Sequence, residues 1–385
     1  MRYNFGLRIL QVTNFVNHLQ LPVARQLASI VGENNFRFAA VSKLDTDRLN
    51  LGWRDKYTEP WILRVSENKF DLAEFNNWWD TADVVISGER YFKRMSNRIK
   101  NGRLCFYMSE RWWKPPIGIM RIFSPRFFSM LLQFKKLVKN SAFHYLSKGP
   151  FASRDIDLIA NLSGRKWKWG YFSENFLLKK FPNQKESKII KILWAGRMLK
   201  WKRVDTLILS IADLSKRGFE INLTIAGEGP EINKLKKLAK KILNPAEYLF
   251  CNSINPDKIP QLMFDHDIFV LPSSAYEGWG FVINEAMNSE CAVIASQSAG
   301  AAAAMIKHNV NGLLFKSGNW RELSSNIELL INDKELRYTL INNARITVQD
   351  KWSPNCAAKR FISVVNALLN NKNIPIYEDG PMSKT

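Results

Sequence analysis

Short apolar runs alternate with amphipathic stretches along the whole chain, and they fall into two series. In the first half, the apolar runs predict β-strands at residues 7–12, 36–42, 82–87, 103–108 and 143–147. In the second half, they predict strands at residues 191–195, 221–226, 248–251, 268–271, 292–295 and 312–315. Amphipathic helices are predicted between them, at residues such as 21–30, 204–216, 231–242 and 320–330. This alternation predicts an α/β protein with two doubly wound parallel sheets that face a cleft.

A polar, basic segment, Leu177 to Lys188, separates the two series and is the predicted linker. The length of 385 residues also fits two domains. We expect these domains at residues 1–180 and 189–350. A further amphipathic helix at about 353–370 is expected to pack back on the first domain, and the last residues, 373–385, are expected to be frayed.

Composition narrows the class of protein. With 46% hydrophobic residues, the chain can build packed cores, which excludes a disordered protein. The four cysteines are scattered without a C-x-x-C spacing, which favours a reduced, cytosolic protein over a disulfide framework or a zinc site. The first residues do not resemble a signal peptide, and no stretch approaches the roughly 20 apolar residues of a spanning helix.

The net charge of +21 is concentrated in one region. Between Arg90 and Lys148, fourteen Lys and Arg stand against a single acid, Glu110. Within it, residues 114–140 combine basic side chains with many apolar and aromatic ones, directly after Trp112 and Trp113. This composition is typical of a helix at an anionic membrane surface. The alternative is a pair of core helices with basic exposed faces.

Two carboxylates lie close together in the stretch Ile268 to Ser296. An apolar strand is followed there by a short polar loop, Glu277, the sequence Gly278-Trp279-Gly280-Phe281, and a helix that carries Glu285. A strand, a glycine-rich loop and a helix suit a phosphate-bearing ligand, because free backbone N–H groups gather where a helix begins. The two acids can then bind sugar hydroxyls. An E-x₇-E spacing alone carries little information, since most such pairs are surface charges.

The first strand of the second domain leads into two cations. Arg197 follows that strand directly, and Lys202 comes five residues later. Side chains just past the carboxyl end of a strand point toward the predicted cleft, where Arg and Lys are suited to a diphosphate. In a chain with 56 Lys and Arg, surface charge is the alternative. The tight turn Ala226 to Pro230 is by itself only a turn signal.

Together these motifs resemble the family-4 retaining glycosyltransferases of the GT-B fold, which has two Rossmann-like domains. The resemblance covers residues 191–361 and is weaker in the first half, where it points to a bacterial surface-polysaccharide branch. The segments that carry it are Gly196 to Lys202, Ala226 to Pro230, Glu277 to Met287, Ala292 to Ser296 and Asn311 to Phe315, with Asn14 to His18 and Trp169 to Phe172 in the first half.

The resemblance implies a role for each matching residue. Arg197 and Lys202 would grip the donor diphosphate, Glu285 would accept hydrogen bonds from the ribose, and Glu277 would bind the transferred sugar. Backbone groups from Gly278 to Phe281 would meet sugar and phosphates, and backbone near Asn252 and Ser253 would read the base. The resemblance also implies a nucleotide-sugar donor, a glycan or lipid-linked acceptor, no metal or other cofactor, and a cytoplasmic site at the inner face of the cell membrane.

The first half departs from the family pattern at several places. Asn17-His18 stands where a Gly-Gly pair is common, so that loop is expected to border the cleft on the acceptor side. Ser109-Glu110-Arg111 stands where many relatives have a His. Glu110 is then either an acceptor-site group or a structural partner of Arg111 or Arg103, and the structural interpretation is favoured. His144 is expected in the core.

Two other functions remain open on the sequence. One is a GT-B sugar-nucleotide epimerase, or a hydrolase that uses Glu277 and Glu285 as a carboxylate pair. Arg197 and Lys202 argue against the hydrolase, because they call for phosphates. The other is a non-catalytic basic module that binds a membrane or nucleic acid. The intact Arg, Lys and Glu set argues against a decayed enzyme, and nucleic acid is not expected as a partner.

Overall fold

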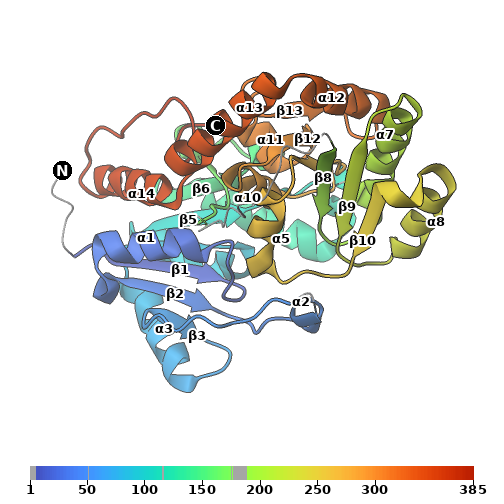
Figure 1. The fold of residues 1–385 in the computed structure, drawn as a ribbon. Coiled ribbons are helices and arrows are strands. Elements are labelled where there is room, and N and C mark those ends of the chain that lie inside the picture. The colour runs from blue at the N-terminus through green and yellow to red at the C-terminus, as the bar shows by residue number, and fades with distance from the viewer. Residues whose placement is uncertain (1–5, 51, 115–116, 175, 177–188) are drawn as a thin grey trace. The chain divides into compact units, whose positions relative to one another are not determined.

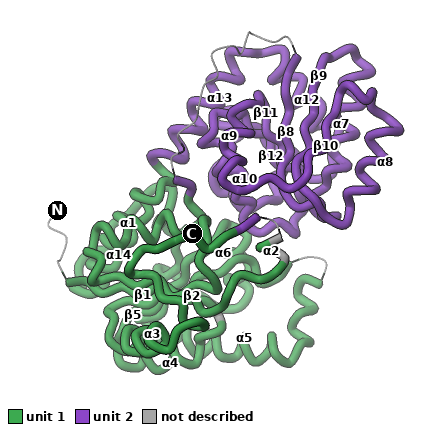
Figure 2. The backbone as a smooth tube through the Cα atoms, turned by 60° about the horizontal axis from the view of Figure 1, so that its bottom comes forward, with its two compact units in different colours: residues 1–49, 54–172, 351–385 green, residues 50–53, 173–350 purple. Residues whose placement is uncertain are grey.

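The computed structural model describes residues 6–50, 52–114, 117–174, 176 and 189–385. They belong to two compact units, coloured separately in Figure 2. The first unit contains residues 1–49, 54–172 and 351–385, and the second contains residues 50–53 and 173–350. The predicted linker, residues 177–188, lies outside the described residues.

The first unit is built on a parallel sheet. Its described residues form seven strands in the order β3-β2-β1-β4-β5-β6-β7. Figure 1 labels β1, β2, β3, β5 and β6 of this sheet. The strands are β1 (Ile9–Thr13), β2 (Phe36–Ala40), β3 (Ile62–Arg64), β4 (Val84–Ser87), β5 (Leu104–Ser109), β6 (Phe143–Lys148) and β7 (Lys166–Trp169). The sequence does not predict β3 and β7. Both are short edge strands, and β7 alternates Lys with Trp, so neither makes a continuous apolar run.

Helices lie between these strands, as the sequence predicts. They are α1 (Leu21–Val31), α2 (Thr46–Asn50), α3 (Lys69–Thr81), α4 (Phe92–Lys100), α5 (Pro125–Leu137), α6 (Pro150–Asp157) and α14 (Pro354–Leu369), with short turns η1 (Glu33–Asn35), η2 (Glu89–Tyr91) and η3 (Gly118–Phe123). Helix α1 has Pro22 in its first turn and ends at Gly32, whose φ of +89° favours glycine. Helix α14 packs against α1, and its Phe361 contacts Phe106 of β5.

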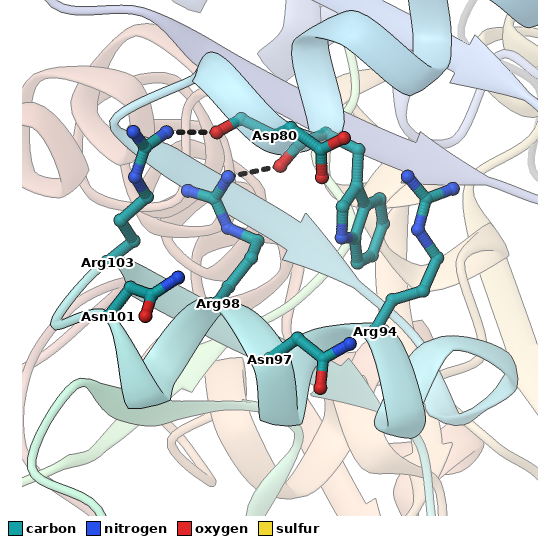
Figure 3. A pocket seen from close by; sticks show the side chains of 7 residues that line it. Asp80, Arg94, Asn97, Arg98, Asn101 and Arg103 are labelled. Carbon is teal, nitrogen blue, oxygen red and sulfur yellow. Dashed lines mark hydrogen bonds between the residues drawn. The ribbon is translucent and has the colours of Figure 1, made fainter.

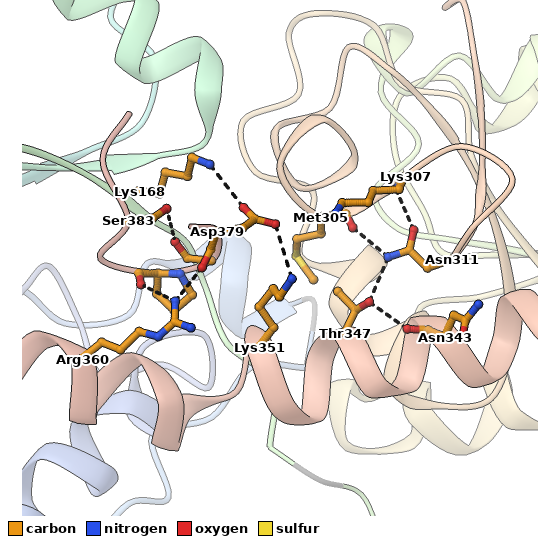
Figure 4. A network of polar contacts seen from close by, with 12 residues as sticks. Lys168, Met305, Lys307, Asn311, Asn343, Thr347, Lys351, Arg360, Asp379 and Ser383 are labelled. Carbon is orange, nitrogen blue, oxygen red and sulfur yellow. Dashed lines mark hydrogen bonds and ion pairs between the residues drawn. The ribbon is translucent and has the colours of Figure 1, made fainter. Parts of the chain in front are cut away.

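The C-terminal tail is ordered, so the prediction of a frayed end is wrong. The backbone N–H of Met382 donates to Lys168 O at 2.8 Å, and that of Lys168 donates to Ser383 O at 2.8 Å. Asp379 accepts from Lys168 and Arg360 binds the tail's backbone (Figure 4). Edge strand β7 offers unpaired backbone groups, and pairing with them satisfies the tail despite its polar sequence.

The second unit repeats the design. Its described residues form six parallel strands in the order β10-β9-β8-β11-β12-β13. The strands are β8 (Ile190–Ala195), β9 (Ile221–Ala226), β10 (Tyr248–Cys251), β11 (Ile268–Leu271), β12 (Ala292–Ser296) and β13 (Leu313–Phe315). All six match predicted runs. Their buried side chains, such as Trp194, Ile225 and Val270, form one core with the surrounding helices.

The helices of the second unit cover this sheet. They are α7 (Val204–Lys216), α8 (Ile232–Ile242), α9 (Ile259–Phe264), α10 (Val282–Asn288), α11 (Gly300–Met305), α12 (Trp320–Asn332) and α13 (Lys334–Ile346), with turns η4 (Lys200–Lys202), η5 (Pro245–Glu247), η6 (Pro256–Lys258) and a π-helical turn, η7 (Thr347–Lys351). The buried Asn311 fixes the loop before β13, because its amide donates to Met305 O and Thr347 Oγ1, both at 2.9 Å (Figure 4).

Candidate active site

Three loops meet at the carboxyl ends of β8, β9 and β10. The N–H of Met198 donates to Glu228 O at 2.7 Å, and the N–H of Gly227 donates to Cys251 O at 3.1 Å. A Cβ on Gly227, whose φ is +131°, would lie 1.9 Å from Gly196 O. Only glycine allows this approach. The turn at 226–230 is uninformative alone, yet it lies directly against the loop that carries Arg197.

Lys202 and Glu277 come together across two loops. The ammonium Nζ of Lys202 lies 2.5 Å from Glu277 Oε2, and both side chains are largely buried. Trp201 fixes the approach, because its carbonyl accepts from Ser274 N–H at 2.8 Å and its ring stacks on Tyr276. Two residues that are 75 positions apart thus form one charged pair at the carboxyl ends of β8 and β11, the edge where doubly wound sheets bind ligands.

The glycine-rich loop after β11 is held from both sides. Gly280 has a φ of +82°, and a Cβ there would lie 3.1 Å from Leu271. The N–H groups of Gly300 and Ala301 donate to the carbonyls of Gly278 and Trp279. The Trp279 ring is buried and its Nε1 donates to Asn284 at 2.8 Å. Trp279 therefore has only backbone to offer a ligand.

The second acid of this stretch lies deeper. Helix α10 begins just after Phe281, which is half-buried, and carries Glu285 in its first turn. The Glu285 side chain is buried, and in the described part of the chain its carboxyl has no hydrogen-bond donor. Burial raises the pKa of Glu285 to about 8. A ligand hydroxyl that donated to this carboxylate would stabilise its charged form.

The remaining donor-side candidates lie on neighbouring loops. Arg197 is exposed on the loop after β8. Asn252 is exposed after β10, and the N–H of Ser253 lies 3.4 Å from Glu228 Oε1. The structure thus places Arg197, Lys202, Glu277, Asn252 and Ser253 on loops after parallel strands of the second sheet.

The loop after β1 in the first unit carries Asn17 and His18. Asn17 is buried: its Oδ1 accepts from the N–H groups of Leu19 and Gln20 at 3.1 Å, and its Nδ2 donates to Phe15 O at 2.8 Å. These bonds stabilise the turn that leads into α1, so the Asn17 side chain has a structural role in this loop. His18 is half-buried on the same turn.

Glu110 is part of a polar cluster, but its partners differ from those predicted. Lys114 Nζ lies 3.0 Å from its Oε2, and the Tyr171 hydroxyl donates to its Oε1 at 3.1 Å. Arg111 instead pairs with Asp155, and Arg103 binds the backbone of Asp80. The prediction of Arg111 or Arg103 as the partner is wrong, because Lys114, Lys148 and Tyr171 are the groups that act on the Glu110 carboxylate.

Sequence reasoning missed two members of this cluster. Lys148 is a buried cation at the carboxyl end of β6, and its Nζ lies 3.1 Å from the Tyr171 hydroxyl. Burial raises the pKa of Glu110, but Lys114 and Lys148 outweigh it, so the pKa stays below its ordinary value. Burial and Glu110 raise the pKa of Tyr171 well above 10. A Lys directly after a predicted strand was the available signal. His144 lies in the core, as predicted, with a pKa lowered by burial to about 3.

A doubly wound sheet with glycine turns, cations and acids at its carboxyl edge defines a class of nucleotide-binding α/β proteins. Residues 176–347 match the model of the family described as glycosyl transferases group 1.

Curated relatives are also glycosyltransferases by name. The chain is 26% identical over 343 residues to the uncharacterized glycosyltransferase MJ1069 of Methanocaldococcus jannaschii, with 82% of each chain covered. It is 27% identical over 202 residues to the capsular polysaccharide biosynthesis glycosyltransferase CapM of Staphylococcus aureus, covering 49% of this chain and 50% of CapM. The structure of Anabaena Alr3699/HepE in complex with UDP has a TM-score of 0.70 at 16% identity, covering 94% of this chain and 100% of that one. This last likeness confirms the predicted GT-B fold of two Rossmann-like domains.

Proposed function

We propose that the protein is a retaining glycosyltransferase that moves a sugar from a nucleotide-sugar to a glycan or lipid-linked acceptor in surface polysaccharide synthesis. The group 1 domain at 176–347 supports the transfer reaction. The name of CapM supports a polysaccharide product, and UDP in the HepE complex supports a nucleotide donor. The observation that carries the proposal is the Lys202–Glu277 pair beside the interlocked glycine loops.

Charge explains how these residues would act. Breaking the bond between sugar and diphosphate leaves an oxocarbenium-like sugar and an extra negative charge on the phosphate. Arg197 and Lys202 are proposed to stabilise that charge, and one such group typically lowers the barrier by about 2.7–4 kcal/mol. Glu277 orients the sugar through its hydroxyls, and Glu285 accepts from the ribose. With two fixed cations at the leaving group, we propose that no metal is needed.

In this proposal the acceptor hydroxyl approaches on the face of the sugar that the diphosphate leaves, and its proton passes to the departing phosphate. The configuration of the sugar is then retained. The acceptor is proposed to bind to the first unit, where Glu110, Lys148 and Tyr171 form a polar cluster at the carboxyl ends of β5, β6 and β7. Glu110 keeps its charge in that cluster and can accept a hydrogen bond from a glycan hydroxyl.

The first unit also supports an anionic membrane as the place of action. Phe127, Leu131 and Phe134 of α5, with Trp112 and Trp113, are buried in the core. The rest of the segment exposes what we name the apolar surface patch: Ile117, Ile119, Met120, Ile122, Phe123, Phe128 and Leu132. Exposed basic residues flank it, including Arg126, Lys135 and Lys136.

An apolar patch with a basic rim is complementary to anionic lipid, because the apolar side chains enter the interface while the cations meet the headgroups. Phe123, at 81% exposure, is the natural anchor. We therefore propose peripheral binding at the inner face of the cell membrane. None of the described helices is both long and apolar enough to cross a membrane.

A thermal-shift screen against nucleoside diphosphates and nucleotide-sugars tests the proposed function. We expect one nucleotide to raise the melting temperature in a saturable way, since ligands that bind only the folded state stabilise it. A hit should release nucleoside diphosphate when incubated with acceptor extract, and the product's anomeric configuration should match the donor's. Inversion, or stabilisation by nucleic acid but by no nucleotide, would contradict the proposal.

Sedimentation with vesicles tests the membrane part separately. We expect binding to vesicles with anionic lipid, loss of binding at high salt, and several-fold weaker binding after Phe123→Ser. Phe70→Ser is the matched control, since Phe70 lies outside the patch on α3 and is 85% exposed. Equal binding of both variants, or equal binding to neutral vesicles, would rule out the patch as the docking surface.

A further inference from the structure

A basic cavity lies in the first unit, at the end of the sheet opposite to the Glu110 cluster. It has a volume of about 260 Å³. It is lined by Trp79, Asp80, Arg94, Asn97, Arg98, Asn101 and Arg103 (Figure 3). These residues end α3, form α4 and lead into β5. The cavity therefore lies at the amino ends of β4 and β5, whereas the candidate acceptor residues follow the carboxyl ends of β5 and β6.

The three arginines of the cavity have no carboxylate partner. Arg98 donates to the carbonyls of Trp79 and Ala82, and Arg103 donates to the carbonyl of Asp80. Arg94 donates to the amide oxygen of Asn76 at 3.0 Å. No acid among the described residues lies within 4 Å of these guanidinium groups.

Part of this arrangement is structural, because Arg98 and Arg103 satisfy carbonyls at the end of α3, which a helix leaves without partners. Carbonyl oxygens do not neutralise a cation, however. The Asp80 side chain lines the cavity and offsets one charge, so three positive charges face one negative charge there.

Two buried donors in the cavity wall have no acceptor. Arg98 is 4% exposed and Trp79 is 1% exposed. The Nε of Arg98 and the indole Nε1 of Trp79 are closed off from solvent and have no oxygen or nitrogen acceptor in the described structure, although the Cys105 thiol lies beside the Arg98 guanidinium. A buried donor left unsatisfied costs about 1–3 kcal/mol. Burial also lowers the pKa of Arg98 and of Arg94, so the protein holds these cations at a cost. An anion in the cavity would pair with the charges of Arg94 and Arg103, which no carboxylate of the described residues neutralises.

The number of donors indicates the kind of anion. Three arginines and two asparagines, Asn97 and Asn101, line the same space. A carboxylate has two oxygens, whereas a phosphate monoester has three terminal oxygens that can accept from several guanidinium forks. The volume suits a phosphate with a small organic group. We propose that this cavity binds the phosphate group of a small phosphorylated molecule, separately from the nucleotide donor.

Phosphate titrations on the full chain test this proposal. The thermal stability of the protein is measured against inorganic phosphate and against a hexose 6-phosphate, with chloride at matched ionic strength as the reference. We expect saturable stabilisation by phosphate beyond that by chloride, and a lower concentration at half-saturation for the hexose phosphate if the organic group also binds. Equal stabilisation by phosphate and chloride would overturn the proposal.

Variants assign the effect to the cavity. Arg94→Gln and Arg103→Gln should each raise the half-saturating phosphate concentration about tenfold, while Asp80→Asn should lower it several-fold. Arg321→Gln, an exposed arginine of the second unit, is the matched control. Arg98 is left unchanged in these variants, because it is buried and its donors support the end of α3. Unchanged binding in Arg94→Gln and Arg103→Gln would overturn the proposal.

One further variant separates this site from the donor site, which also takes phosphate. Arg197→Ala removes a proposed donor-phosphate cation but leaves the cavity untouched. Stabilisation by inorganic phosphate should therefore persist in Arg197→Ala and weaken in Arg94→Gln. The reverse pattern would place the phosphate at the donor site and overturn the cavity proposal without affecting the proposed glycosyltransferase function.

Discussion

The two units share a parallel sheet but use its carboxyl edge differently. In the second unit, glycines let loops interlock, and a cation and an acid meet at 2.5 Å. In the first unit, the corresponding edge carries Glu110 in a cluster of Lys and Tyr, and the surface beside it exposes apolar and basic side chains. In the proposed reaction, the second unit binds the ribose and diphosphate of the donor, which are common to many reactions, and this would explain its common motifs. The first unit would bind the acceptor, which differs from one enzyme to the next.

The sharpest test of the difference between the units removes a cation that is proposed to bind the donor phosphates. Arg197→Ala should lower turnover at least a hundredfold, because a lost transition-state cation costs about 2.7–4 kcal/mol. Arg197 is exposed, so the fold should survive. Turnover is measured as nucleoside diphosphate released from the donor that the thermal screen selects. Lys216→Ala, at the exposed end of α7, is the control and should keep full turnover. Near-normal turnover in Arg197→Ala would remove Arg197 from the site.

Lys202→Ala should lower turnover to a similar degree, but it also leaves the Glu277 carboxylate buried without its partner. Breaking a buried pair in this way typically costs about 3–5 kcal/mol of stability. The double variant Lys202→Met with Glu277→Gln removes both charges and should recover most of the lost melting temperature while staying inactive. An active double variant would show that the pair serves stability alone.

The next largest effect is expected on the melting temperature, when a glycine in the interlocked loops of the second unit is replaced. Gly227→Ala should lower the melting temperature by about 5 °C or more, since overpacking costs about 1–3 kcal/mol or more and a Cβ would overlap Gly196 O. Gly6→Ala is the matched control, because Gly6 has the same φ of +131° with no atom within 4 Å of its Cβ position. Calorimetry compares the two. Equal losses would mean that backbone strain, and not the loop contact, is responsible.

For the first unit, Lys148→Met should raise the KM for acceptor about tenfold and leave the KM for the donor within twofold. The lost cation faces Tyr171 and Glu110. Without it the pKa of Glu110 rises. As the pH is lowered, activity should therefore begin to fall at a higher pH than in the wild type. Steady-state kinetics across pH checks both effects. A raised donor KM with an unchanged acceptor KM would contradict the division of tasks between the units.

Glu285 gives an effect on stability that appears only when the pH is changed. Its pKa is about 8 in the folded protein, above the ordinary 4.5, so the folded state keeps a proton that the unfolded chain releases between these values. This contribution to stability is full below about pH 4.5 and is lost as the pH rises through 8. The free energy of unfolding should thus fall more from pH 5 to pH 8 in the wild type than in Glu285→Gln. Parallel pH profiles in urea unfolding would contradict the raised pKa.

How far the sequence predicts the structure also differs between the units. Strand β9 and helix α7 begin and end where the apolar pattern places them, because continuous buried runs have a clear period. Strand β7 and the tail at 373–385 escape prediction, since their pairing depends on backbone groups and not on apolar side chains.

The candidate site shows the same limit. Motif spacing brings out Lys202 and Glu277, but it says nothing of their direct contact. The partners of Glu110 could not be predicted either. Lys114 lies four residues along the same irregular loop, where no helical period marks the pair, and Tyr171 reaches Glu110 only through the packing of a second, distant segment. The carboxyl-end rule would have found Lys148, had it been applied to every predicted strand.

The central claim is that the second unit holds the donor through its diphosphate. Titration calorimetry of the full chain with the selected nucleoside diphosphate tests it most directly. We predict one site per chain, a Kd raised at least tenfold by Arg197→Ala, and a Kd unchanged by Lys148→Met. An unchanged Kd in Arg197→Ala together with weakened binding in Lys148→Met would place the nucleotide on the first unit and contradict the account.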